Sequence, residues 1–244
     1  MPIPSATVLL EVWERVIAEP LAVKAFALLA VMHPEAPLET LGAWSVGQRD
    51  RALLLLREGL FGTQLSSVAT CPACAGLLEL EFSTREIMSD AHPIPASFEV
   101  KACGHRALVR VPSVRDLAQL ATERQPSLLE RCLLEVKLSA RAKKKAALQF
   151  GQVLPEELVN AIAAAMSDTD PQAMVELALE CPTCAHRWLA VFDIATYLWR
   201  ELDAWARRTL QDVHRLASAY GWHEADVLAL SPTRRRAYLE LVNT

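Results

Sequence analysis

The sequence predicts an α+β protein that is mostly helical, with a small antiparallel β region and a C-terminal helical module. Apolar residues recur at helical spacing in the first 62 residues and again after residue 193. Between these stretches, short segments alternate apolar and charged residues, as a strand with one buried face does. A Cys-x-x-Cys pair precedes two of the alternating segments. We therefore divide the chain into segments 1–66, 67–192 and 193–244.

The first segment, residues 1–66, is expected to form a small bundle of amphipathic helices. Ser5 is suited to cap the first helix, and Pro20 restarts the chain for the second. Ser45 is suited to cap the third helix, which ends at Gly62.

The middle segment combines strands and helices. Residues 78–82 alternate leucine or phenylalanine with glutamate, and residues 98–111 alternate on both sides of a Cys-Gly turn, which predicts a hairpin. Residues 113–133 return to helical spacing, with Cys132 in an apolar helix face where a buried role is expected. The basic run Arg141–Lys145 is expected to be a solvated loop or helix face.

The last part of the chain is expected to be mainly helical. Pro155 opens a helix, and residues 175–179 form a strand. Asp193 is suited to cap a long amphipathic helix that ends at Gly221. Two short helices follow, the second of which begins at a Ser-Pro pair.

Composition excludes several classes of protein. The 244 residues are 52% hydrophobic with a formal net charge of −4, which supports a folded core and excludes disorder. The longest apolar stretch, Phe26–Met32, is too short to cross a membrane, and Glu11 and Glu14 interrupt any signal-peptide core. We therefore expect a cytoplasmic protein with no membrane partner, in which the six cysteines are metal ligands or core residues.

The most informative pattern is a local repeat at an offset of 110 residues. Cys71-Pro-Ala-Cys74 and Cys181-Pro-Thr-Cys184 are each followed by a strand and a helix start. One pair of thiolates supplies half of a tetrahedral zinc site, and two pairs complete it. We therefore predict one zinc-ribbon-like structural Zn²⁺ site built from Cys71, Cys74, Cys181 and Cys184, with an inserted subdomain between the pairs.

Three alternatives accompany this prediction. The cysteines could be buried small residues, or they could be redox dithiols, although both pairs lead into strands rather than helices. In addition, Cys103, His105 or His186 could replace one ligand, since zinc also accepts imidazole. Knuckles often place glycine after the second cysteine, and this chain has Ala75 and Ala185 there, which speaks against ideal knuckle geometry.

Sequence motifs for catalysis are absent. The chain has no phosphate-binding loop, dinucleotide fingerprint, His-Glu-x-x-His motif or nucleophile elbow. A zinc ion with four thiolate ligands has no open position at which water could be activated. We therefore expect a protein that is not an enzyme.

Several short motifs together point to a family. Arg215–Leu241 contains a long helix ending Tyr-Gly-Trp, a short helix ending in leucine and an arginine-rich helix ending Tyr-Leu. With Phe192–Ile194, Ser45–Arg51, Arg110–Leu117 and the twin Cys-Pro-x-Cys strands, the chain resembles the baseplate hub assembly chaperones of T-even-type phages and contractile tail-like injection systems. The resemblance implies a non-catalytic chaperone that holds baseplate or hub subunits during assembly.

Such a factor needs surface anchors for its protein partners. Trp199 falls on the polar face of the predicted long helix, beside Asp203 and Arg207, and tryptophan is enriched at interface hot spots. The alternative is a tryptophan that the inserted subdomain covers.

Arg234, Arg235 and Arg236 open the last helix and are further candidates for partner binding. The same residues allow a competing function, a helix-turn-helix that binds DNA beside a zinc ribbon. However, residues 200–244 carry seven basic and six acidic side chains, and this near balance makes nucleic acid an unfavourable partner.

Overall fold

The computed structural model describes residues 3–121, 127–138 and 154–242. The basic run Arg141–Lys145 lies outside these described residues. The helices are α1 Ala6–Val16, α2 Leu21–Met32, α3 Leu38–Gly42, α4 Val46–Phe61, α5 Thr84–Ile87, α6 Val114–Leu120, α7 Leu128–Cys132, α9 Glu156–Thr169, the 3₁₀ helix η1 Pro171–Ala173, α10 Ile194–Tyr220, α11 Glu224–Ala229 and α12 Pro232–Val242. The strands are β1 Gln64–Thr70, β2 Leu77–Ser83, β3 Phe98–Ala102, β4 His105–Val109, β5 Leu133–Lys137, β6 Val175–Glu180 and β7 Arg187–Phe192.

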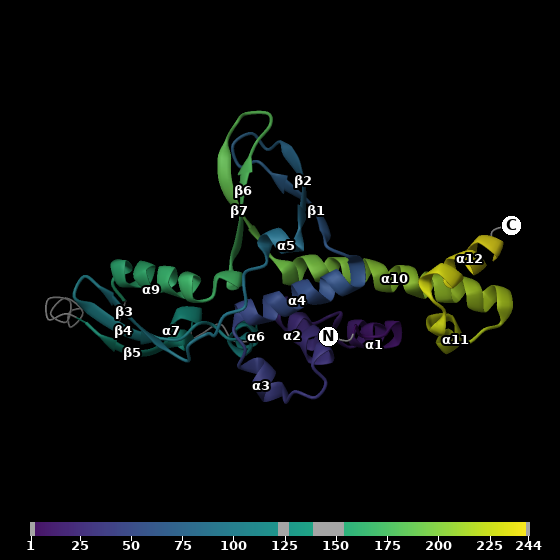
Figure 1. Cartoon of the computed structure of the whole chain (residues 1–244), viewed down its shortest axis with the longest axis horizontal. Helices are drawn as coiled ribbons and strands as arrows, with labels where there is room; N and C mark the ends of the chain where they lie inside the picture. Colours follow the sequence, from purple (N-terminus) through teal and green to yellow (C-terminus); the bar gives the residue numbers. More distant parts are fainter. Residues whose placement is uncertain (1–2, 122–126, 139–153, 243–244) are drawn as a thin grey trace.

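The centre of the molecule is a helical body built from α1, α2, α3, α4 and the first half of α10 (Figure 1). Leu28, Leu29 and Leu53 are fully buried in its core together with Leu198 and Leu202 of α10. The predicted first and last segments therefore share one core. This body and the small antiparallel sheets confirm the predicted α+β class.

Local signals place the ends of the helices where the sequence predicts them. The Ser5 hydroxyl accepts a hydrogen bond from the N–H of Val8, and Ser45 caps α4 in a reciprocal capping box with Gln48. The Asp193 carboxylate caps α10, which runs for 27 residues until Gly221 adopts a left-handed φ of 69°. No helix among the described residues is long and apolar enough to cross a membrane.

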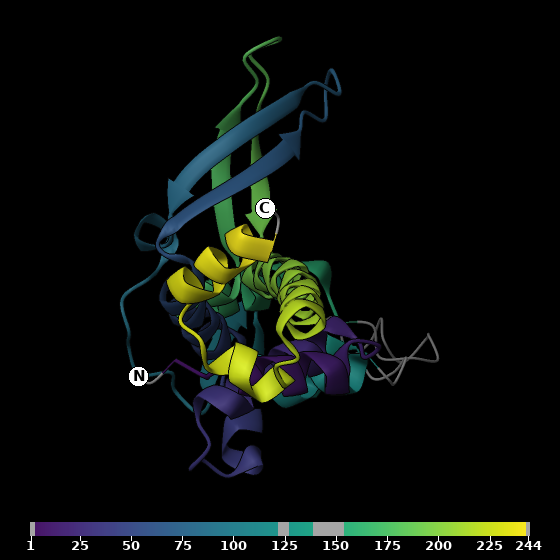
Figure 2. The same cartoon turned by 90° about the vertical axis from the view of Figure 1, so that its right-hand side faces the viewer.

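Two antiparallel hairpins, β1–β2 and β6–β7, project together from the helical body (Figures 1 and 2). We call this pair of hairpins the tower. At its base the rings of Phe82 and Phe192 meet edge to face, with centroids 5.3 Å apart. Strands β2, β6 and β7 agree with the sequence prediction, but β1 was not predicted.

The remaining sheet lies beside the body and has the order β3–β4–β5, with α9 packed on it through Leu158 and Ile162 (Figure 1). The predicted hairpin within residues 98–111 is confirmed by β3 and β4. The helical spacing predicted for residues 113–133 corresponds to α6 and α7, but α7 ends at Cys132, and the chain continues from Leu133 as β5 along β4, a strand that was not predicted.

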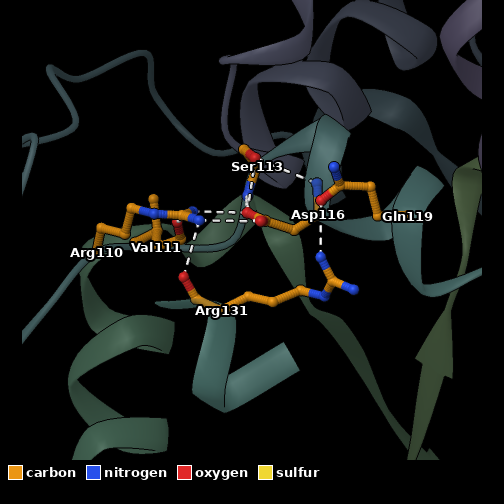
Figure 3. A network of polar contacts seen from close by, with 6 residues as sticks. All are labelled: Arg110, Val111, Ser113, Asp116, Gln119 and Arg131. Carbon is orange, nitrogen blue, oxygen red and sulfur yellow. Dashed lines mark hydrogen bonds and ion pairs between the residues drawn. The ribbon is translucent and has the colours of Figure 1, made fainter. Parts of the chain in front are cut away.

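A polar network joins the end of β4 to α6 and α7 (Figure 3). The guanidinium of Arg110 donates two hydrogen bonds to the Asp116 carboxylate, at 2.6 and 2.9 Å, and a third to the carbonyl of Arg131. Ser113 also donates to Asp116 from its N–H and its hydroxyl. Although burial opposes ionisation, these bonds lower the pKa of Asp116.

Next to this network, two distant backbone segments pair. The N–H of Val46 donates to the carbonyl of Pro112, and the N–H of Val114 donates to the carbonyl of Trp44. The bridge places Ser45 beside Ser113, so the start of α4 and the start of α6 are held together.

The C-terminal module consists of α11 and α12 packed against the second half of α10. Val227 is fully buried there together with Leu216 of α10. The rings of Tyr220, Trp222 and Tyr238 form a three-membered aromatic cluster with centroid separations of 4.8 to 5.9 Å. The tower and this module therefore lie on different parts of the helical body (Figure 1).

Candidate metal centre

The two turns at the tip of the tower have the same backbone geometry. In the first knuckle, the N–H of Cys71 donates to the carbonyl of Gly76, and the N–H of Ala75 donates to the carbonyl of Cys71, both at 2.9 Å. In the second, Cys181 donates to His186 and Ala185 donates to Cys181, again at 2.9 Å. The sequence repeat is therefore a structural repeat.

The residue after each second cysteine turns left-handed despite the missing glycine. Ala75 has a φ of 58° and Ala185 a φ of 55°. The sequence-based argument against ideal knuckles at these alanines was therefore wrong. A side chain in this region costs about 1–2 kcal/mol per residue, which the surrounding hydrogen bonds must offset.

The four predicted cysteines converge between the two knuckles. The Sγ atoms of Cys71 and Cys184 are 3.7 Å apart, and those of Cys74 and Cys181 are 3.6 Å apart. All four Sγ atoms lie within 4.8 Å of one another. A zinc ion with bonds of about 2.3 Å to four sulfurs in a tetrahedron implies sulfur separations of about 3.8 Å. The thiol set therefore fits a tetrahedral thiolate-binding metal ion.

Burial differs within the site. Cys71 and Cys181 are 1% and 3% exposed, whereas Cys74 and Cys184 are exposed. Each knuckle thus contributes one buried and one exposed sulfur, and the exposed pair lies on the solvent side of the tip.

The thiols also differ in acidity. The N–H groups of Cys184 and Thr183 lower the pKa of the Cys181 thiol to about 6. The N–H of His186 favours the thiolate of Cys184, but the neighbouring Cys74 sulfur and burial raise the pKa of Cys184 to about 12. The Cys181 thiol therefore ionises more readily than the Cys184 thiol, and a bound cation would favour the thiolate forms that metal coordination needs.

The alternative ligands lie outside the sulfur cluster. Among the described residues, the cluster of potential metal ligands at the tip of the tower consists of the four cysteines alone. Cys103 is exposed in the β3–β4 turn, His105 is buried in β4, and His186 stacks on Trp188. The expected core position of Cys132 is correct: the residue is fully buried, and burial raises the pKa of its thiol to about 11.

Trp199 is half-buried and packs against the core of the helical body. The ammonium of Lys24 in α2 lies 4.8 Å from the centroid of its ring. Its neighbour Asp203 accepts hydrogen bonds from the indole of Trp13 and from Arg207, each at 2.9 Å. The contacts that cover part of Trp199 therefore come from the helical body.

The three arginines of α12 do not share one environment. Arg234 and Arg236 are exposed, whereas Arg235 is buried. The guanidinium of Arg235 lies 3.5 Å from the carbonyls of Leu228 and Leu230, at the end of α11. Assigning Arg235 to partner binding is therefore corrected, because it packs inside the C-terminal module.

Tyr197 was not singled out from the sequence, yet it fixes the tower to the body. Its hydroxyl donates to the carbonyl of Ser66 at 3.0 Å and accepts from the N–H of the same residue at 3.1 Å. Its position four residues after Asp193 placed it on α10, but its partner lies on the unpredicted strand β1.

The protein is thus a helical body that carries two paired knuckles. Their four sulfurs form a candidate metal site of the structural type, in which every ligand position is filled by cysteine. The chain belongs to a family of phage baseplate proteins, described as T4 bacteriophage base plate protein, whose model matches residues 33–199. No curated protein and no solved structure matches the chain significantly.

The family match covers the features that organise the tower. It includes both knuckles and the paired segments Ser45–Arg51 and Arg110–Leu117. It ends at Trp199, so most of α10 and the C-terminal motif Arg215–Leu241 lie outside the match. The match begins at residue 33, so α1 and α2 of the helical body also lie outside it, and the baseplate relationship rests on the part of the chain that carries the tower.

Proposed function

We propose that the protein is a non-enzymatic, zinc-stabilised chaperone for the baseplate or hub of a phage tail or phage-tail-like contractile injection system. The observation that carries this proposal is the family match, which spans residues 33–199 and so includes α3, α4 and both knuckles. The resemblance of the remaining C-terminal motif to baseplate hub assembly chaperones supports the finer assignment.

Zinc is the ion we propose for the tower. Four sulfurs at near-tetrahedral separations are typical of structural zinc, and such a site leaves no open position for a substrate. Binding to four-cysteine sites of this kind contributes on the order of 10 to 16 kcal/mol. That energy is enough to determine whether the two hairpins stay together.

The surface of the C-terminal module supports contact with proteins. Arg234 and Arg236 are exposed on α12, and Leu241 of the same helix is 64% exposed. Arginine and apolar groups on one short helix are suited to a protein interface. We propose that Arg234 and Arg236, with the accessible part of Trp199, contact the client.

The test is co-expression of the full chain with individual baseplate and hub proteins, followed by size-exclusion chromatography and mass spectrometry of finished particles. A chaperone is expected to form a complex with at least one of them and to be absent from the particle. Stoichiometric retention in the particle would show a structural subunit instead. Failure to bind any of them would contradict the proposal.

A second measurement separates this function from DNA binding. Titration with duplex DNA at increasing salt is expected to show no specific complex. Tight binding whose affinity falls steeply with salt would contradict the proposal and favour the helix-turn-helix alternative.

A further inference from the structure

The tower contains a cleft that the metal site does not use. Its volume is about 340 Å³, and it lies between β2 and β6. Leu80–Phe82 line one wall and Glu176–Leu179 the other, while Glu86 and Ile87 of α5 contribute to the lining. Consecutive residues of a strand alternate between its two faces, so a cleft lined by consecutive residues runs along a strand edge. Among the described residues, β2 and β6 are not hydrogen-bonded to each other.

The backbone of Glu81 faces this cleft. Ser66 pairs in register with Glu81, and Ser66 directs its N–H and carbonyl away from β2, to Tyr197. In an antiparallel pair the two opposed residues either both bond across the pair or both point outward. Glu81 therefore directs its N–H and carbonyl away from β1.

The same alternation applies to β6. The N–H of Cys181 bonds to the carbonyl of His186, so this pair bonds inward. Because bonded and non-bonded pairs alternate along the register, Ala178 and Glu176 direct their backbone N–H and carbonyl groups away from β7. Backbone groups of both strands are thus open to a further strand, as on an unprotected sheet edge.

The charge of the tower indicates which segment fits. Residues 64–83 and 174–193 contain five carboxylates and one arginine, a formal charge of −4 that equals that of the whole chain. Glu81 and Glu176 are exposed, and among the described residues neither has a salt-bridge partner. Below the acidic rim, Leu80, Phe82 and Leu177 provide an apolar lining.

We propose that this cleft binds an extended, basic segment of a protein partner, which adds as a strand to the edge of β2 or β6. Main-chain hydrogen bonds to Glu81 and Glu176 supply register, and the carboxylates select lysine or arginine at alternate positions. The inference rests on the proposed function, because the segment belongs to a baseplate or hub client.

The experiment titrates the zinc-loaded full chain with an acetylated peptide of alternating lysine and valine, followed by amide NMR shifts. The N–H signals of Glu81, Glu176 and Ala178 are expected to move most. A peptide of alternating glutamate and valine should not bind, and N-methylation of alternate lysine–valine amides should abolish binding, because it removes strand donors. Shifts confined to other regions would overturn the proposal.

A charge-reversed variant links the cleft to the client. The double substitution Glu81→Lys, Glu176→Lys is expected to weaken peptide binding and client binding about tenfold or more. The matched control Glu19→Lys, Glu35→Lys changes the same charge at exposed sites outside the tower and outside α12. If both variants bind the client as the unmodified chain does, the proposal that the client binds in this cleft is contradicted, whereas the proposed chaperone function is not. If the unmodified chain itself binds no baseplate or hub client, the proposed function is contradicted.

Discussion

At the scale of single residues, the two knuckles place alanine where the backbone prefers glycine. Ala75 and Ala185 both have a positive φ and both donate to the carbonyl of the first cysteine of their knuckle. The sequence predicted the ligands from residue type and spacing. It did not predict the conformation of the alanines, because the tertiary sulfur cluster overrides a local preference.

Replacement of these alanines by glycine is expected to stabilise the tower. Ala75→Gly or Ala185→Gly should raise the free energy of unfolding by about 0.5–1 kcal/mol each, because glycine adopts a positive φ without steric cost. Urea denaturation of the zinc-loaded chain measures the effect. The control Ala69→Gly, in strand β1, should lower stability, and a loss of stability in all three variants would contradict the strain argument.

Asp50 predicts a pH dependence of stability. Burial raises its pKa to about 7, although Arg49 lies 2.7 Å away, and the nearby carboxylates of Asp193 and Asp170 add to the increase. The folded state therefore holds a proton that the unfolded chain, with an ordinary aspartate pKa, releases. The contribution of this group to stability is present in acid and is lost as the pH rises towards 7.

The variant Asp50→Asn isolates that effect, because an asparagine oxygen still accepts from Arg49. Relative to the unmodified chain, the variant should gain about 2–3 kcal/mol between pH 5 and pH 8. Thermal or urea unfolding across this range gives the difference. Parallel stability curves for the two proteins would show that Asp50 ionises in the folded state as easily as in the unfolded one.

At the scale of elements, helices with caps were predictable and two strands were not. Ser45 and Asp193 fix the starts of α4 and α10, because their side chains bind the first free N–H groups. In β1, the three less exposed side chains include Ser67 and Ala69, which are small or polar, so the apolar alternation in the sequence is weak. In β5, the apolar residues also fit a helical period, and pairing with β4 decides the outcome.

The contact between α10 and β1 can be tested through Tyr197. The substitution Tyr197→Phe removes both hydrogen bonds to Ser66 and keeps the ring contact with Arg57. We expect a loss of about 1–2 kcal/mol and faster hydrogen exchange at the Ser66 amide. The control Tyr220→Phe, in the C-terminal module, should leave that exchange rate unchanged, and equal rates in all three proteins would contradict an anchoring role.

At the scale of the whole molecule, the sulfur cluster joins regions that are far apart in sequence. Cys71 and Cys184 are separated by 113 positions. The core of the helical body does not include the cysteines of the tower. The sequence could predict the shared site from the repeat, but it could not place the tower on the body, since that placement depends on side-chain contacts such as Phe82 with Phe192.

Metal removal should therefore unfold the two hairpins of the tower and leave the helical body folded. A strong chelator is expected to release one zinc ion per chain, to abolish amide protection in both hairpins, and to leave the helical signal of the body largely intact. Cys181→Ser should reproduce this effect and Cys103→Ser should not, because Cys103 lies outside the cluster. Metal analysis with hydrogen exchange measures both, and full protection without metal would contradict a structural ion.

The long separation between the two knuckles also affects how the chain is synthesised. At about 5–20 residues per second, a ribosome needs roughly 6 to 23 s to translate the 113 positions from Cys71 to Cys184. During that interval the nascent polypeptide holds only one thiol pair, which offers two of the four ligands. Closure around an ion is consequently a late step of biogenesis, and it joins the earliest-made hairpin to one that emerges after most of the polypeptide has been translated.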